Sequence, residues 1–193
     1  WLLDHPYDFF FFDYRGYGRS EGEPTPENTV ADGIAAIEWA HKRAPKRPIV
    51  VFGQSLGGAV ALRAAADCKD RFPIKFVAVD STFPSYRGMA REVMSRSILT
   101  WPLQWLGWLL MSDRHAPEGR IASIAPIPTL VVHGTQDQTV KYEMGERVFE
   151  QARDPKEFWR ISGGGHTDMF AIQDKSYKDR FVARMEAALE GRF

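Results

Sequence analysis

Ser55 is the residue whose type and setting point most directly to chemistry. It lies in the sequence GQSLGG at 53–58, between an apolar run at 48–52 and an alanine-rich run at 56–68. A serine on a sharp strand-to-helix turn has a strained backbone, and glycines flank it because larger neighbouring side chains would collide. Such a turn would expose the hydroxyl as a nucleophile and direct the Leu56 N–H toward a developing oxyanion.

Two other interpretations of the same turn are an incidental serine in a glycine-rich loop and a cradle for phosphate. The chain contains no G-x-x-x-x-G-K-[ST] sequence, which excludes a Walker-type phosphate loop. The strand-like run before Ser55 and the helix-like run after it favour the nucleophile.

A serine hydroxyl needs a base to take its proton, and histidine is suited to that role near neutral pH. His166 lies in the glycine-rich segment 162–168 after the last predicted strand, a loop flexible enough to bring the imidazole over Ser55. We predict His166 as the base and keep His133, at the end of an earlier strand, as the second candidate. The other histidines precede Ser55 or fall in an inserted segment (His5, His41 and His115).

The base in turn needs a carboxylate that orients its ring. Asp137 follows the fourth predicted strand and completes the chain order serine, aspartate, histidine, so we predict it as the acid. Asp80, at the end of the third predicted strand, is the rival, whereas Asp168 is too close to His166 in sequence to orient it easily. The structural alternative for each is a turn aspartate that caps its own backbone.

Strand-like and helix-like runs alternate along the chain, which predicts a parallel sheet with crossover helices. Apolar or aromatic runs predict strands at 7–14, 48–52, 74–79, 127–132 and 157–161. Helices are predicted from Pro26, with Thr25 as the N-cap, and over 56–68, 142–152 and 176–190. We expect a single α/β domain over 1–193 with a doubly wound, mostly parallel sheet.

Residues 83–119 interrupt this alternation, and a bare loop of this length would be unusual. We predict a small helical cap with three tryptophans at helical spacing (Trp101, Trp105 and Trp108). The tryptophans could line an apolar acyl pocket or face a membrane or partner, but packing of the cap onto the sheet is favoured. Tyr17, in the glycine-rich loop at 15–23, is a further candidate for substrate contact.

Composition limits the possible partners and compartments. Basic and acidic residues both number 25, so the zero net charge gives no reason to expect nucleic acid or an anionic membrane as a partner. The single cysteine, Cys68, excludes an internal disulfide and a cysteine-based zinc site, and it suits the cytoplasm. The longest apolar run, at 98–111, is too short to span a bilayer.

Four segments together resemble the α/β-hydrolase superfamily: DYRGYGRSEG at 13–22, GQSLGG at 53–58, HGTQDQTV at 133–140 and GGGHTD at 163–168. They are most similar to the small serine hydrolases grouped around serine aminopeptidases, acylglycerol lipases and protein depalmitoylases. The resemblance implies a Ser55–His166–Asp137 triad that cleaves an acyl ester, thioester or amide through an acyl-enzyme, without metal or cofactor.

Within this superfamily, ester or thioester cleavage is favoured over peptide cleavage. A peptidase would need an acidic pair to grip the substrate amine, and no spacing marks such a pair among the acidic residues of the cap (Glu92, Asp113 and Glu118). A non-catalytic binding module would show a degraded triad, whereas all three candidates are present here in the correct order.

The resemblance also predicts that this chain is a piece of a longer protein, so that a targeting or anchor segment would lie outside it. In related hydrolases three further strands and a helix precede the segment at 13–22, and a loop after the third strand supplies the second oxyanion donor. That strand would lie between those at 7–14 and 48–52, so we expect a gap in the sheet. Loss of one oxyanion donor costs about 10²–10³ in kcat, so we expect the piece alone to be unstable or poorly active.

Overall fold

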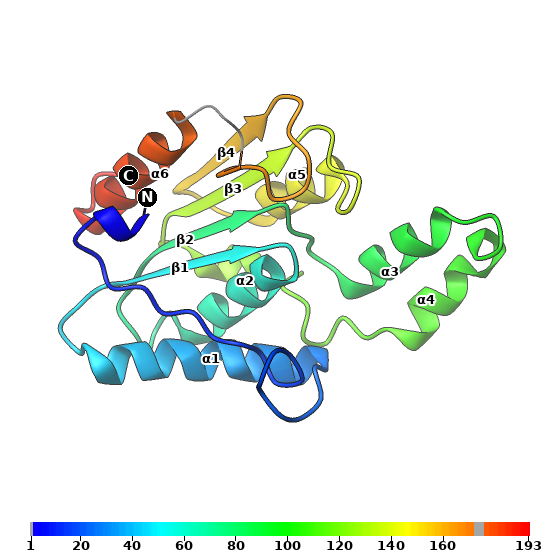
Figure 1. Cartoon of the computed structure of the whole chain (residues 1–193), viewed down its shortest axis with the longest axis horizontal. Coiled ribbons are helices and arrows are strands. Elements are labelled where there is room, and N and C mark those ends of the chain that lie inside the picture. Colours follow the sequence, from blue (N-terminus) through cyan, green and yellow to red (C-terminus); the bar gives the residue numbers. More distant parts are fainter. Residues whose placement is uncertain (1, 172–175) are drawn as a thin grey trace.

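Four parallel strands form the centre of the structure, a computed structural model that describes residues 2–171 and 176–193 (Figure 1). They are β1 (Ile49–Gln54), β2 (Ile74–Asp80), β3 (Thr129–Gly134) and β4 (Lys156–Ile161), in the order β1-β2-β3-β4. All neighbouring pairs are parallel, so the carboxyl ends of the four strands meet at one edge of the sheet. The predicted α/β class and parallel sheet are confirmed.

Helices cover both faces of this sheet. One face carries α1 (Pro26–Arg43), α2 (Leu56–Cys68), a 3-10 turn (Ile121–Ile124) and α5 (Tyr142–Gln151), and the other carries α6 (Ser176–Leu189). Side chains alternate along each strand, so Val77 packs toward the first layer while Phe76 packs toward α6. The helix predicted from Pro26 begins there because the Thr25 side chain accepts a hydrogen bond from the Asn28 N–H at 3.2 Å.

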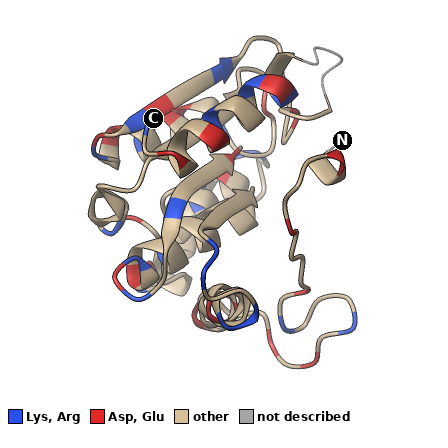
Figure 2. Ribbon diagram, turned by 90° about the vertical axis from the view of Figure 1, so that its left-hand side faces the viewer, with Lys and Arg blue, Asp and Glu red and all other residues tan. Residues whose placement is uncertain are grey.

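Residues 7–14 do not form the predicted strand. After a 3-10 turn at Leu2–Asp4 the segment runs outside the sheet without a ladder to β1, which is an edge strand among the described residues (Figure 2). Its contacts are with helices instead: the Tyr7 hydroxyl donates to Glu186 at 2.9 Å, and Phe10 stacks on Trp39 with ring centroids 4.3 Å apart. The aromatic run matches a buried strand in composition, but a strand also requires a partner for its backbone.

The segment between β2 and β3 projects from the body as a helical hairpin (Figure 1). It contains α3 (Tyr86–Ser95), a 3-10 turn (Trp101–Leu103) and α4 (Gln104–Leu110). The helices approach closely at Gly107, where a Cβ atom would lie 3.0 Å from the Met94 sulfur. Within residues 2–171 and 176–193 no helix has the length and apolar character needed to cross a membrane.

The favoured interpretation of the tryptophan stripe is wrong. Trp101, Trp105 and Trp108 are each at least 60% exposed, and none packs the hairpin onto the sheet. Because α4 uses its Gly107 side against α3, its large apolar side chains face outward. Helical spacing showed that the tryptophans share a face but not which side of the helix is covered.

Candidate active site

Ser55 occupies the junction of β1 and α2 with a strained backbone, at φ 52° and ψ −122°. Its N–H donates to the Asp80 carbonyl at 2.9 Å, and its own carbonyl accepts from the Thr82 hydroxyl at 2.8 Å. Leu56 is the first residue of α2, so its N–H has no partner within the helix and is free to serve an anion. Both neighbouring contacts come from the end of β2, so the adjacent strand holds this turn in place.

Only part of the predicted glycine crowding around Ser55 is present. A Cβ on Gly53 would lie 2.2 Å from the Gly57 carbonyl oxygen, and one on Gly58 would lie 2.6 Å from the Thr82 Cβ. A Cβ on Gly57 would meet only the Tyr14 hydroxyl, at an ordinary 3.7 Å. The steric argument therefore holds for Gly53 and Gly58 and is wrong for Gly57.

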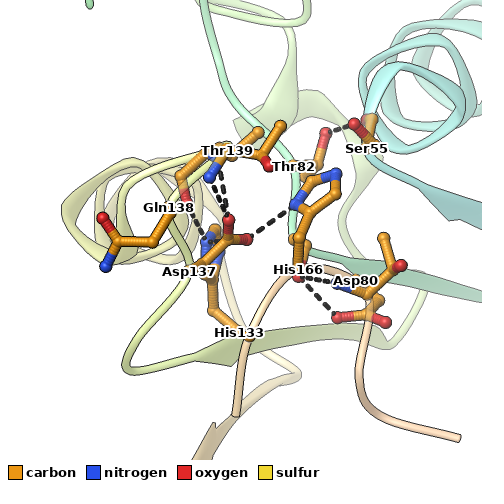
Figure 3. A network of polar contacts seen from close by, with 12 residues as sticks. Ser55, Asp80, Thr82, His133, Asp137, Gln138, Thr139 and His166 are labelled. Carbon is orange, nitrogen blue, oxygen red and sulfur yellow. Dashed lines mark hydrogen bonds and ion pairs between the residues drawn. The ribbon is translucent and has the colours of Figure 1, made fainter. Parts of the chain in front are cut away.

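Asp137 and His166, from the loops after β3 and β4, are joined by a hydrogen bond. The His166 Nδ1 lies 2.8 Å from the Asp137 Oδ2, and the Asp137 Oδ1 accepts the N–H groups of Thr139 at 2.8 Å and Val140 at 2.9 Å (Figure 3). Burial alone would raise the pKa of Asp137, but its bonds to His133, His166 and these two N–H groups hold the pKa well below the ordinary value. The carboxylate is therefore ionised and fixed in orientation.

His133, the second candidate for the base, lies behind the Asp137 carboxylate. Its side chain is fully buried, and its Nε2 lies 2.9 Å from the Val140 carbonyl and 3.4 Å from the Asp137 Oδ2. A ring in this place contacts the Asp137 carboxylate and is closed off from the surface. The contact depends on the turn that follows β3, because a spacing of four residues brings side chains together only on a helix.

Asp80, the rival acid, is completely buried and is bonded to other groups than His166. Its carboxylate accepts from the Gln54 amide and the Ser81 hydroxyl, each at 3.0 Å. Burial raises the pKa of Asp80 against the opposing effect of these bonds. Asp168, as expected from its position, bonds within its own loop, accepting the Gly165 N–H at 2.7 Å.

His166 occupies the middle of the predicted triad. In Figure 3 its ring lies between the Asp137 carboxylate and Ser55, although no hydrogen bond joins the ring to the Ser55 hydroxyl among the residues drawn. The His166 side chain is 24% exposed, while that of Asp137 is buried. Nucleophile–base contacts are often long before substrate binds, so this arrangement suits a base that closes on Ser55 during reaction.

The residues predicted to contact substrate are spread over the surface. Tyr17 is 46% exposed and packs edge-on against Tyr14, while the three tryptophans lie on the projecting hairpin. Tyr14, which the sequence analysis did not single out, has its hydroxyl beside Gly57 at the Ser55 turn. Burial raises the pKa of Tyr14 to about 12, so the hydroxyl keeps its proton. Its place in the aromatic run at 7–14 concealed it.

The base of the hairpin is fastened beside these loops. Leu56, Met89 and Met111 pack against one buried cluster, which also contains Phe83 and Val140. Two polar contacts tie α3 to the Asp137 loop: Arg96 donates to the Thr139 carbonyl at 2.7 Å, and Lys141 pairs with Glu92 at 3.0 Å. A shift of the hairpin would therefore displace the loop that carries Asp137.

Comparison with known proteins agrees with this architecture. YfhR of Salmonella typhi, an uncharacterized protein, is 34% identical over 203 residues, covering 100% of this chain and 66% of YfhR. The lysophosphatidylserine lipase ABHD12 of Danio rerio is 27% identical over 184 residues, covering 91% of this chain and 47% of the lipase. The Pyrococcus furiosus esterase Pf2001 shares the fold, with a TM-score of 0.66 and 21% identity over 92% of this chain and 68% of its own.

The model of one family, serine aminopeptidase S33, matches residues 1–121. This match spans more than half of the chain and includes the Ser55 turn, β2 and the hairpin. The chain belongs to the serine aminopeptidase S33 family of α/β hydrolases.

Proposed function

We propose that the protein is a serine hydrolase that cleaves carboxylic esters or thioesters through an acyl-enzyme. The observation that carries this proposal is the 2.8 Å contact between the buried Asp137 and the partly exposed His166, at the sheet edge where the strained Ser55 turn lies. The fold brings together these residues, which are distant in sequence. A buried carboxylate that orients an accessible imidazole beside a serine is the arrangement of a catalytic triad.

In the proposed reaction the Ser55 hydroxyl attacks the acyl carbonyl carbon while the His166 Nε2 takes its proton. Asp137 accepts the Nδ1–H, which keeps the other ring nitrogen free as the base and stabilises the imidazolium. The Leu56 N–H donates to the oxyanion. His166 then protonates the leaving alcohol or thiol, and water activated by the same ring releases the acid and restores Ser55.

Two features of the hairpin support ester over peptide substrates. The Glu92 carboxylate pairs with Lys141 and Arg96, and that of Asp113 accepts from the Ser85 hydroxyl and the Arg87 N–H. These acids are engaged in holding the hairpin together, so they are poorly placed to bind the amine of a peptide. The intact set of Ser55, Asp137 and His166 argues against a binding module without activity.

We further propose that the substrates carry an apolar acyl chain and that the hairpin rests on a phospholipid surface. Between Val93 and Met111 the only charged residue is Arg96, and most of the large apolar side chains there are exposed. Further arginines flank this stretch (Arg87, Arg91 and Arg114), a charge that complements lipid phosphates. A relative that acts on lysophosphatidylserine fits this substrate class.

Hydrolysis of p-nitrophenyl esters from acetate to palmitate by the full-length protein tests the proposal. We expect turnover that disappears in Ser55→Ala and peaks at one chain length. Alanine p-nitroanilide serves as the peptidase substrate in parallel. Serine-dependent cleavage of the anilide alone would replace ester hydrolysis by peptidase activity, and no serine-dependent turnover of either substrate would overturn the proposed activity.

A further inference from the structure

Three residues other than glycine have a positive φ among the described residues: Ser55 at 52°, Ser81 at 55° and Thr167 at 56°. They come from three loops, after β1, β2 and β4, and Thr167 directly follows His166. A backbone in this region is strained for such residues and persists only where surrounding contacts impose it. Asp80 contacts the first two directly and reaches Thr167 through Ser81.

A continuous path of hydrogen bonds runs through Asp80 and Ser81. The Asp80 carbonyl accepts the Ser55 N–H at 2.9 Å, and its Oδ2 accepts the Gln54 amide at 3.0 Å, so both ends of Asp80 hold the serine turn. The Asp80 Oδ1 accepts the Ser81 hydroxyl proton at 3.0 Å. The Ser81 oxygen in turn accepts the Thr167 N–H at 3.0 Å, which ends the path beside His166.

The residues at the centre of this path are buried, and each of its hydrogen bonds has a defined donor and acceptor. Asp80 and Ser81 are both 0% exposed, so water does not replace these contacts. The Ser81 hydroxyl has one proton, which it donates to Asp80, and this leaves its lone pairs directed at the Thr167 N–H. The Ser81 N–H also donates to the Val132 carbonyl at 2.9 Å, and this bond anchors Ser81 to β3.

We propose that Asp80 and Ser81 are positioning residues that set the place of His166 relative to Ser55. This inference rests on the proposed function and adds to it a cause for the alignment of base and nucleophile, whose side chains share no direct bond here. Neither residue touches the reacting atoms. Asp80 thus has a role distinct from the acid of the triad, which is Asp137.

Variants of Ser81 separate positioning from folding. Ser81→Ala removes the acceptor for Thr167, and Ser81→Gly removes it while also relieving the positive φ. We expect kcat to fall by about 10- to 100-fold in both, as small displacements of a base do, with KM little changed. We also expect the pH profile of kcat to shift, and Ser81→Gly to unfold at a higher temperature than Ser81→Ala because glycine relieves the positive φ. Thr129→Val, which removes a buried hydroxyl at the amino end of β3, is the matched control and should retain wild-type kcat.

Variants of Asp80 separate a positioning residue from the triad acid. Asp80→Asn keeps an oxygen that accepts from the Ser81 hydroxyl. The Gln54 amide can turn so that its oxygen accepts from the new asparagine NH2, so we expect nearly wild-type kcat. Asp80→Leu keeps neither acceptor and should resemble Ser81→Ala. A loss in Asp80→Asn as large as that in Asp137→Asn would overturn the proposal, because it would make Asp80 the acid.

Failure of this inference is distinguishable from failure of the proposed function. If turnover depends on Ser55 but Ser81→Ala has the kcat and pH profile of the wild type, the positioning role of Asp80 and Ser81 is overturned. The proposed hydrolase activity would still stand. If Ser55-dependent turnover is absent, NMR titration of the His166 ring decides instead. A titration curve of the ring that changes in Ser81→Ala but not in Thr129→Val would support the positioning role of Asp80 and Ser81. A curve that is unchanged in Ser81→Ala would overturn it.

Discussion

The proposed acid and base differ in exposure, and the difference fits their separate roles. The Asp137 side chain is buried, with its carboxylate held by two backbone N–H groups, whereas His166 reaches the surface. A buried, fully bonded carboxylate orients a ring without exchanging protons with solvent. The partly exposed ring can exchange them with a substrate.

At the residue scale, Asp137→Asn should lower kcat by about 10⁴ because an amide at this position favours the wrong tautomer of His166. Steady-state kinetics on a soluble short-chain ester measures the loss. Asp168→Asn is the matched control, since Asp168 lies two residues from His166 and, among the described residues, its carboxylate accepts a hydrogen bond from Gly165 in its own loop. Equal losses of kcat in the two variants would contradict the role of Asp137 as the carboxylate that orients His166.

The buried Asp80 makes the free energy of unfolding depend on pH, and measurements of unfolding at several pH values can detect this dependence. Burial raises the pKa of Asp80 in the folded state, so the native protein binds this proton more tightly than the unfolded chain. The contribution of Asp80 to stability is therefore complete below the ordinary value of about 3.9 and is lost as the pH rises through the folded pKa. Asp80→Asn, which does not titrate, should gain stability relative to the wild type as the pH rises from about 4 through the raised pKa of Asp80.

Urea unfolding of the two proteins at several pH values measures this difference. Groups that do not interact with Asp80 contribute equally to both proteins and cancel in the comparison. A difference in the free energy of unfolding that stays constant with pH, or that falls as the pH rises, would contradict the assigned direction of the shift.

At the scale of elements, the turn from β1 into α2 depends on one glycine much more than on its neighbour. Gly53→Ala should destabilise the fold by about 1–3 kcal/mol, because its Cβ would lie 2.2 Å from a backbone oxygen that cannot move freely. Gly57→Ala, on the same turn but with an ordinary contact at 3.7 Å, should be neutral or stabilise by up to about 1 kcal/mol. Thermal or denaturant unfolding compares them, and similar losses in both would show that the crowding is misassigned.

The elements themselves were largely predictable from the sequence, because strands buried in a parallel sheet form short apolar runs between longer helical ones. The helix at Leu56–Cys68 matches its predicted range, and the strands differ only by a few end residues. The prediction for the segment at 7–14 was wrong because its composition suits a buried strand, whereas its backbone forms no ladder with β1, the edge strand among the described residues. The local residue pattern of a segment indicates whether its side chains are buried more reliably than it indicates whether its backbone pairs with another strand.

The site was predictable only in part, for a related reason. Ser55, His166 and Asp137 follow from motifs and chain order, which are local features. The link from Asp80 through Ser81 to Thr167 joins residues 86 positions apart, and no local pattern indicates such a contact. The outward-facing tryptophans likewise depend on which side of α4 meets α3.

At the scale of the whole molecule, the zero net charge leaves the hairpin as the feature that would direct the protein to a membrane. We expect the full-length protein to co-sediment with phosphatidylcholine vesicles and more strongly when they contain phosphatidylserine. Replacing all three tryptophans by serine should weaken binding by about 100-fold, since each contributes on the order of 1 kcal/mol of apolar transfer. Turnover of a soluble short-chain ester serves as the control for intact folding.

Light scattering distinguishes the lipid surface from a second copy of the chain as the partner. A wild-type dimer that dissociates on replacement of the tryptophans, together with no vesicle binding, would contradict the membrane proposal. Because the chain spans 66% of YfhR, these experiments belong to the full-length protein.

The most direct test of the central claim is the reaction of the full-length protein with a fluorophosphonate, followed by mass spectrometry of the labelled peptide. We expect one adduct on Ser55, absent in Ser55→Ala and formed much more slowly in His166→Ala, because the hydroxyl is reactive only beside its base. No adduct in the wild type, or labelling that persists in Ser55→Ala, would contradict the assignment of Ser55 as the nucleophile.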